Sequence, residues 1–162
     1  MRVFTLELNN DIKGIGQRKE YIKSLIAKLP SPDLVALPEL ALCSYMANQQ
    51  IWQYADERGS DTSAWAMEMA EKYHTFIGVG YLDKENGDYY NRYLIADESK
   101  VYGTVTKSEG ESAVFKRGFY DSIINTPVVY VNSKGRLEYM PGKMGQMMKT
   151  DDVSLILLRE ML

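Results

Sequence analysis

The stretch DLVALP (residues 33–38) is nearly all apolar and is followed at once by Glu39. A strand covered on both faces of a parallel sheet has this composition, so we predict a buried strand here. Upstream, Arg2 to Leu8 carries apolar residues in a short alternating pattern, which predicts another strand. Between the two, Gly16 to Leu29 carries apolar residues at helical spacing and ends at Pro30. Strand, helix and strand in this order predict a parallel pair of strands.

The position of Glu39 follows from this arrangement. In open α/β sheets, functional groups gather beyond the carboxyl ends of the strands. Glu39 comes directly after the second predicted strand. We therefore treat it as the first candidate functional residue.

The middle of the chain predicts one clear helix and a meander. We expect a short helix over 47–57 and a longer one from Thr62 to Tyr73, with Asp61 as its cap. Asn86-Gly87 supplies the two left-handed residues that a tight hairpin needs. The expected strands of the meander are 75–82, 88–96 and 101–106. The fold class that follows is α/β, with a βαβ start, a mixed sheet and a meander.

The last third is less regular. Residues 126–131 and 136–139 can pair across the turn at 133–135. Residues 140–148 have little periodicity and are predicted to form a loop. The end of the chain, 151–162, suits either a buried strand through VSLILL or the last turn of a helix through LLREML.

Composition narrows the classes of function. The chain has 162 residues, 45% of them apolar and 25% charged, so we expect one domain over 1–162. A net charge of −3 gives no electrostatic reason to expect nucleic acid or an anionic membrane as partner. The single cysteine, Cys43, rules out an internal disulfide and suits a reducing cytoplasm. The start of the sequence does not read as a signal peptide, and no apolar run reaches membrane-spanning length.

Three segments carry a resemblance to a known family. They are DLVALPELALCSY (33–45), YYNRYLIADESKVYGTVTK (89–107) and EGESAVFKRG (109–118). In this order and near this spacing, they resemble the signatures of the carbon–nitrogen hydrolase, or nitrilase, superfamily. The resemblance covers roughly the first 120 residues and implies a truncated form of that family's four-layer αββα fold.

The resemblance also implies a catalytic site. Glu39 matches the family's general base, Lys107 the lysine that stabilises the tetrahedral oxyanion, and Glu111 the second carboxylate, which positions substrate and base. Ser108 stands where the family usually has a histidine. The chemistry has its own physical reasons, because a carboxylate can take a proton in the transition state and an ammonium lowers the energy of a developing oxyanion.

The family's nucleophile is a cysteine that follows a Thr-Pro-Gly-like stretch. Asn125-Thr126-Pro127 is present, but no cysteine follows it, and residues 128–146 are instead similar to a later strand of the family. Cys43 is interpreted as a buried structural thiol. His74 has no patterned partners, no metal-ligand spacing appears, and we expect no cofactor.

Two functions therefore stay open. The first is a hydrolase, or amidohydrolase, that acts on a small-molecule amide or nitrile. The second is a non-catalytic binding or oligomerisation module derived from the same fold. Because a half-length copy would leave one apolar sheet face uncovered, we expect a homo-oligomer.

Overall fold

The computed structural model describes residues 2–108, 113–118, 123–126, 129–132, 137–139 and 154–158. The helices are α1 (Ile15–Ile26), the 3₁₀ helix η1 (Gln49–Tyr54) and α2 (Ser60–Tyr73). The strands are β1 (Arg2–Leu6), β2 (Leu34–Ala36), β3 (Asp56–Glu57), β4 (Phe76–Glu85), β5 (Asp88–Ala96), β6 (Val101–Thr106), β7 (Ile123–Asn125), β8 (Val129–Asn132), β9 (Leu137–Tyr139) and β10 (Ser154–Leu158).

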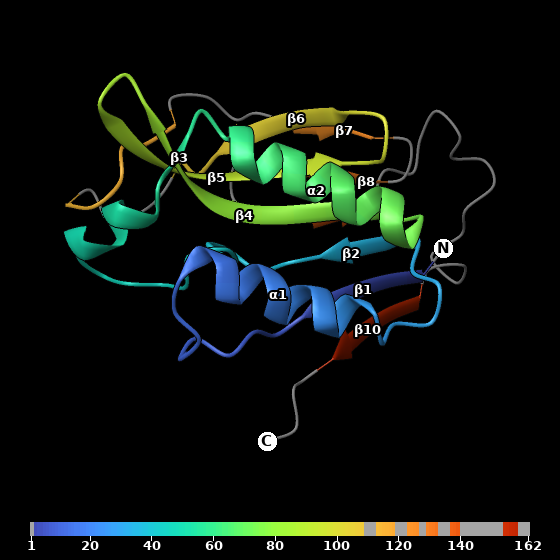
Figure 1. Cartoon of the computed structure of the whole chain (residues 1–162). Helices are drawn as coiled ribbons and strands as arrows, with labels where there is room; N and C mark the ends of the chain where they lie inside the picture. Colours follow the sequence, from blue (N-terminus) through green and yellow to red (C-terminus); the bar gives the residue numbers. More distant parts are fainter. Residues whose placement is uncertain are drawn as a thin grey trace.

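A mixed sheet forms the centre of the molecule (Figure 1). Its strand order is β10-β1-β2-β4-β5-β6, and β3 pairs with β4 outside this path. The pairs β10-β1, β1-β2 and β2-β4 are parallel, whereas β4-β5-β6 is an antiparallel meander. The predicted βαβ start and mixed sheet are therefore confirmed.

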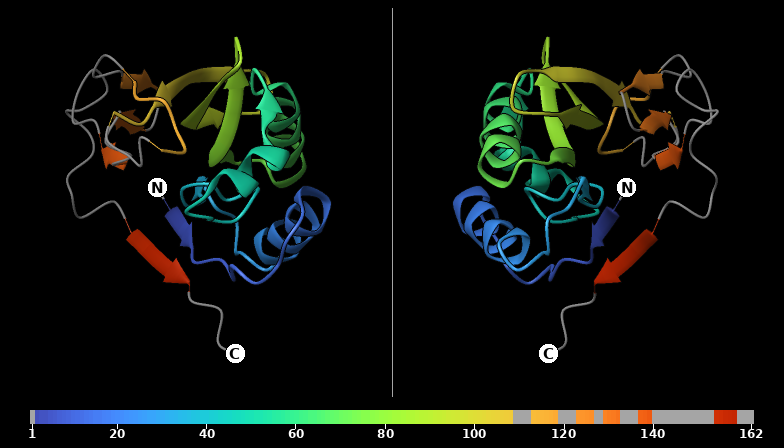
Figure 2. Two further views of the ribbon diagram at one scale, coloured as in Figure 1. Left: turned by 90° about the vertical axis from the view of Figure 1, so that its left-hand side faces the viewer. Right: turned by 90° about the vertical axis from the view of Figure 1, so that its right-hand side faces the viewer.

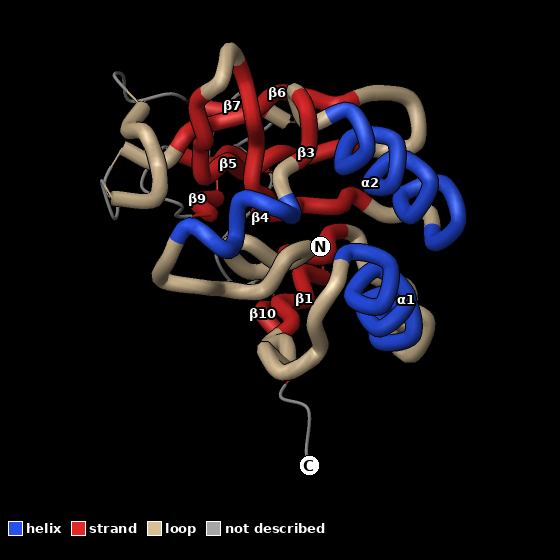
Figure 3. Tube along the Cα trace, turned by 60° about the vertical axis from the view of Figure 1, so that its left-hand side comes forward, coloured by secondary structure: helices blue, strands red, loops and turns tan. Residues whose placement is uncertain are grey.

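The two faces of the sheet are covered differently. Figure 2 shows α1 and α2 on one face and the small sheet β7-β8-β9 on the other, and Figure 3 shows both helices on the same side of the strands. The core under the helices includes Ile22, Ile26, Trp65, Ala66, Met69, Ile77, Val79 and Leu94. Helix, sheet and sheet are three successive layers of the expected αββα arrangement.

The face away from the helices is not bare among the described residues. Val3, Leu34, Ile95 and Val105 are all buried there and share a cluster with Ile124 of β7. The uncovered apolar face from which we expected an oligomer is thus not found in the described part of the chain. The homo-oligomer itself stays a prediction.

Several local expectations are confirmed and others shift. Asn86 and Gly87 have φ values of 54° and 85°, as a tight hairpin turn between β4 and β5 requires. The predicted pairing of 126–131 with 136–139 is found as β8 against β9. Residues 154–158 form the strand alternative at the chain end. The predicted loop 140–148 lies outside the described residues.

The helices differ in their ends. The expected short helix over 47–57 is η1, and α2 begins before Thr62. Its capping carboxylate is Asp56 rather than the expected Asp61, because Asp56 accepts hydrogen bonds from the backbone N–H groups of Asp61 and Thr62 at 3.2 and 2.7 Å. No helix in the described residues combines the length and the apolar character that crossing a membrane requires.

Candidate active site

Glu39 reaches the site because the chain crosses β4 directly after β2. The backbone N–H of Leu37 donates to the carbonyl of Gly78 at 2.8 Å. A Cβ on Gly80 would lie 2.6 Å from the carbonyl oxygen of Pro38 and 2.7 Å from Glu39 Cα. Glycine at position 80 therefore allows the backbone that carries Glu39 to lie against the strand.

Lys107 is held beside β5 by its backbone. It directly follows β6, and its N–H donates to the carbonyl of Asn91 at 2.9 Å. Its own carbonyl accepts a hydrogen bond from the N–H of Gly118 at 3.0 Å. These two contacts place the start of the Lys107 side chain between two neighbouring segments.

The side chains of Glu39 and Lys107 meet at the edge of the sheet. Lys107 Nζ lies 2.7 Å from Glu39 Oε1, and Asn91 Nδ2 donates to the same oxygen. Asn91 is 5% exposed, whereas the side chains of Glu39 and Lys107 are 44% and 35% exposed. The two side chains that the family resemblance assigned to one site are therefore in contact, and the contact faces solvent.

Asn91 is a site residue that our sequence reasoning missed. Its signal was the Tyr-Asn pair at 90–91, which we used as part of a motif without assigning a role. The strand register explains its position, because Leu82 and Asn91 lie opposite each other in the β4-β5 pair, next to the crossing at Gly80. Glu111 lies outside the described residues, so its predicted role stays a prediction.

Cys43 is buried, as interpreted from the sequence. It is 1% exposed, and its Sγ lies 3.6 Å from the carbonyl oxygen of Leu40. Burial raises the pKa of the thiol to about 12, although the positive charge of Arg18 acts in the opposite direction. A thiol that is protonated and covered in this way is a poor nucleophile.

Arg18 fastens two loops below the site. Its guanidinium is 1% exposed and donates to the carbonyls of Ala41 at 2.5 Å, Asn9 at 2.9 Å and Ile12 at 3.0 Å. The loop after β1 is thereby tied to the loop that follows Glu39. Burial lowers the pKa of Arg18 from its ordinary value.

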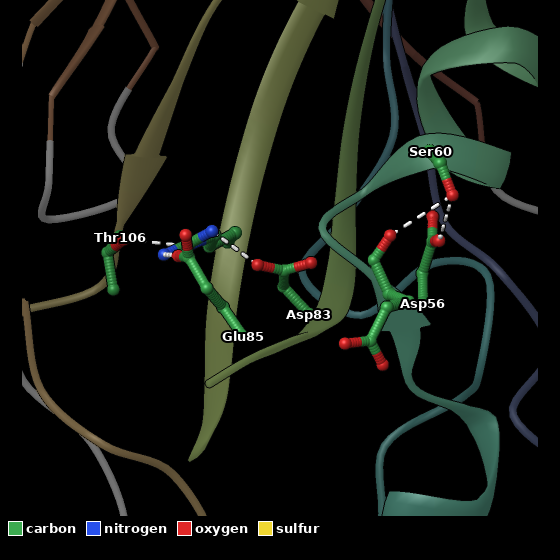
Figure 4. A network of polar contacts seen from close by, with 7 residues as sticks. Asp56, Ser60, Asp83, Glu85 and Thr106 are labelled. Carbon is green, nitrogen blue, oxygen red and sulfur yellow. Dashed lines mark hydrogen bonds and ion pairs between the residues drawn. The ribbon is translucent and has the colours of Figure 1, made fainter. Parts of the chain in front are cut away.

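A second polar network supports the meander from the other face of the sheet (Figure 4). Arg92 pairs with the buried Asp83 and contacts Glu85 at 2.7 Å and Thr106 Oγ1 at 3.1 Å. Burial raises the pKa of Asp83, and Arg92 opposes this shift. Because Asn91 and Arg92 are consecutive in β5, their side chains point to opposite faces. The network therefore holds β4, β5 and β6 together behind the Glu39–Lys107 contact.

No metal centre accompanies this arrangement in the described residues, where no group of three or more His, Cys, Asp or Glu side chains is placed to hold an ion. The chemical groups on hand are a carboxylate, an ammonium and an amide. Together they can bind a polar carbonyl-like group, take up a proton and stabilise negative charge on oxygen.

Fold and site together define a class: an α/β protein that presents a paired carboxylate and ammonium at the strand ends of a mixed sheet. The family model for carbon-nitrogen hydrolases matches residues 9–143. The chain belongs to the carbon-nitrogen hydrolase family.

Solved structures of the same superfamily share the fold. An N-terminal amidase superposes with a TM-score of 0.60 at 20% identity, over 68% of this chain and 28% of its own. XC1258 from Xanthomonas campestris is a CN-hydrolase superfamily protein with an arsenic adduct in its active site. It superposes with a TM-score of 0.62 at 20% identity, over 75% of this chain and 49% of its own. Nit3 of Saccharomyces cerevisiae, from branch 10 of the nitrilase superfamily, superposes with a TM-score of 0.57 at 20% identity, over 73% of this chain and 47% of its own.

The chain spans less than half the length of these three proteins, and at this identity the likeness establishes the fold alone. A comparison with curated proteins gave no match.

Proposed function

We propose that this chain acts on the carbon–nitrogen bond of a small amide or nitrile at the Glu39–Lys107 contact. The observation that carries the proposal is the 2.7 Å approach of Lys107 Nζ to Glu39 Oε1, with Asn91 donating to the same carboxylate oxygen. Two residues far apart in the sequence thus place a base and a cation at one solvent-facing position. The family of the chain supports the class of bond.

The reaction that fits the described residues uses water, because Cys43 is covered and protonated. Glu39 takes a proton from a water molecule while the oxygen of that water attacks the carbonyl carbon of an amide. Lys107 stabilises the negative charge that develops on the carbonyl oxygen. When the C–N bond breaks, the proton on Glu39 passes to the leaving nitrogen, and a carboxylic acid and an amine or ammonia are released.

The second candidate is a binding module that recognises the same group without cleaving it. The burial of Cys43 favours this function, because catalysis without a covalent nucleophile is slower by several orders of magnitude in enzymes that normally use one. In this case Glu39 and Lys107 hold an amide through hydrogen bonds. If the chain is such a module, we also expect it to self-associate, and light scattering on size-exclusion fractions tests this.

One experiment separates the two. Short amides and nitriles are incubated with the wild type, Glu39→Gln, Lys107→Met and Cys43→Ser, and both release of ammonia and equilibrium binding are measured. The hydrolase is supported by turnover that falls at least tenfold in the Glu39 and Lys107 variants and persists in Cys43→Ser. Binding that depends on the same two residues, without turnover, supports the module. Equal behaviour of all four proteins rejects both.

A further inference from the structure

A pocket of about 550 Å³ opens at the hairpin end of β5. Its lining residues come from η1, from the β4-β5 turn and from the segment 113–117, and they are Trp52, Gly87, Asp88, Tyr89, Ala113, Val114, Phe115, Lys116 and Arg117. None of them belongs to the Glu39–Lys107 contact. The volume suits a small organic molecule or one end of a larger one.

One wall of the pocket is aromatic and fixed in place. The rings of Trp52 and Tyr89 stack with centroids 4.4 Å apart and planes inclined by 1°. Trp52 Nε1 donates to the carbonyl oxygen of Val114 at 2.9 Å, which ties the indole to the opposite wall. A ring pair held in this way offers a flat apolar surface at little entropic cost to a ligand.

The pocket continues the surface that carries the site. Tyr89 and Asn91 are two residues apart in β5, so their side chains point to the same face about 7 Å apart. The backbone repeats this relation, because Lys116 N–H donates to the Tyr89 carbonyl as Lys107 N–H donates to that of Asn91. One short ligand can therefore span the distance from Lys107 to the aromatic wall.

The described lining of the pocket carries more positive than negative charge. Lys116 pairs with Asp88, so these two groups compensate each other. Arg117 is exposed at the same pocket and has no ion pair or hydrogen bond within the described residues. An uncompensated guanidinium is a good partner for a carboxylate, which it can bind with two parallel hydrogen bonds.

We infer that the pocket binds a single carboxylate on a short apolar chain, with Arg117 as its charge partner and the Trp52–Tyr89 stack against the chain. Combined with the proposed function, on which this part rests, the pocket makes the substrate class an amide that carries a carboxylate at its far end. The carbonyl group of the amide lies at Glu39 and Lys107, and the carboxylate lies at Arg117.

Four six-carbon probes test this inference by calorimetry: adipamate, neutral hexanamide, cationic 6-aminohexanamide and hexanoate. In the wild type, adipamate should bind at least about threefold more tightly than hexanamide and more tightly still than the cationic amide. Arg117→Gln should raise the Kd of adipamate and of hexanoate by roughly three- to tenfold, and it should change that of hexanamide less than about twofold. Lys28→Gln removes an exposed charge in the turn that follows α1 and is the control, expected to leave all four values unchanged.

The site of binding is read from Trp52. Ligand should quench tryptophan fluorescence in the wild type and not in Trp52→Phe, because the other tryptophan, Trp65, is buried in the core between α2 and the sheet. Equal affinity of adipamate and hexanamide, or an Arg117→Gln protein that binds adipamate like the wild type, overturns the inference.

Failure of the two proposals can be told apart. Hexanoate needs only the pocket, so Arg117-dependent binding of hexanoate with no binding of any amide supports the pocket and rejects the proposed function. Amide binding or turnover that requires Glu39 and Lys107 but does not change in Arg117→Gln supports the proposed function and rejects the pocket.

Discussion

Replacing Gly80 by alanine tests how Glu39 is placed. The added methyl group would lie 2.6–2.7 Å from three backbone atoms of residues 38–40, whereas ordinary van der Waals contact begins at about 3.4 Å. These backbone atoms, or the strand itself, must therefore shift by about 0.7 Å. A movement of that size stretches the 2.7 Å contact between Glu39 Oε1 and Lys107 Nζ beyond good hydrogen-bond distance.

Two quantities should change in Gly80→Ala. Overpacking against backbone costs about 1–3 kcal/mol of folding free energy, which for a chain of this size lowers Tm by roughly 3–10 °C. Amide turnover or binding should fall by about tenfold or more in the fraction that is folded, since a displacement of this order at a catalytic group is costly. Thermal unfolding followed by circular dichroism gives the first quantity, and the amide assay well below Tm gives the second.

Gly16→Ala is the matched control. Gly16 lies in the first turn of α1, and nothing lies within 4 Å of a Cβ built there. Alanine should therefore leave the amide assay unchanged and raise stability by up to about 1 kcal/mol. If Gly80→Ala keeps both the Tm and the amide affinity of the wild type, the crossing of residues 38–40 over β4 does not position Glu39 as described.

Three further predictions concern the surroundings of the site. Cys43 should not react with a disulfide reagent at pH 8 in the native protein and should react fully in guanidinium, because its thiol is buried and its pKa is raised to about 12; fast native labelling contradicts this. Burial acts to raise the pKa of Asp97, but hydrogen bonds from Tyr102, Ser99 and the backbone outweigh it and lower the pKa to about 2. Ionised Asp97 should thus add about 1 kcal/mol to the free energy of unfolding above pH 4, and this contribution is lost as the pH falls towards 2. The free energies of unfolding that urea titration gives for the wild type and for Asp97→Ala should therefore converge at low pH. Arg18→Met should lower the free energy of unfolding by about 3 kcal/mol in the same assay, since it leaves three carbonyl acceptors without their donor. Arg18→Lys should recover only part of this loss.

The elements near the site could be predicted because each is marked by local sequence. The apolar run 33–38, the Asn86-Gly87 turn and the strand 101–106 have patterns that depend only on neighbouring residues. The family resemblance assigned Glu39 and Lys107 to one site, and their side chains meet because β2 and β6 run in the same direction within one sheet.

What the sequence could not reveal depends on register between distant segments. Asn91 faces Glu39 only because β4 and β5 pair with Leu82 opposite Asn91. Arg18 is buried because two loops turn their carbonyls towards it, and no helical pattern indicates that. Asp56 displaces Asp61 as the cap of α2 because β3 brings its carboxylate to the first helical turn.

The pairing of β10 with β1 has a consequence for the order of assembly. Arg2 lies opposite Ser154 in this register, so β1 pairs with a segment that is synthesised long after it. Until then one edge of β1 exposes unpaired N–H and C=O groups, and closing so long a loop is slow. A nascent chain of this protein is therefore open along that edge to chaperones, or to a second nascent copy, until β10 has been made.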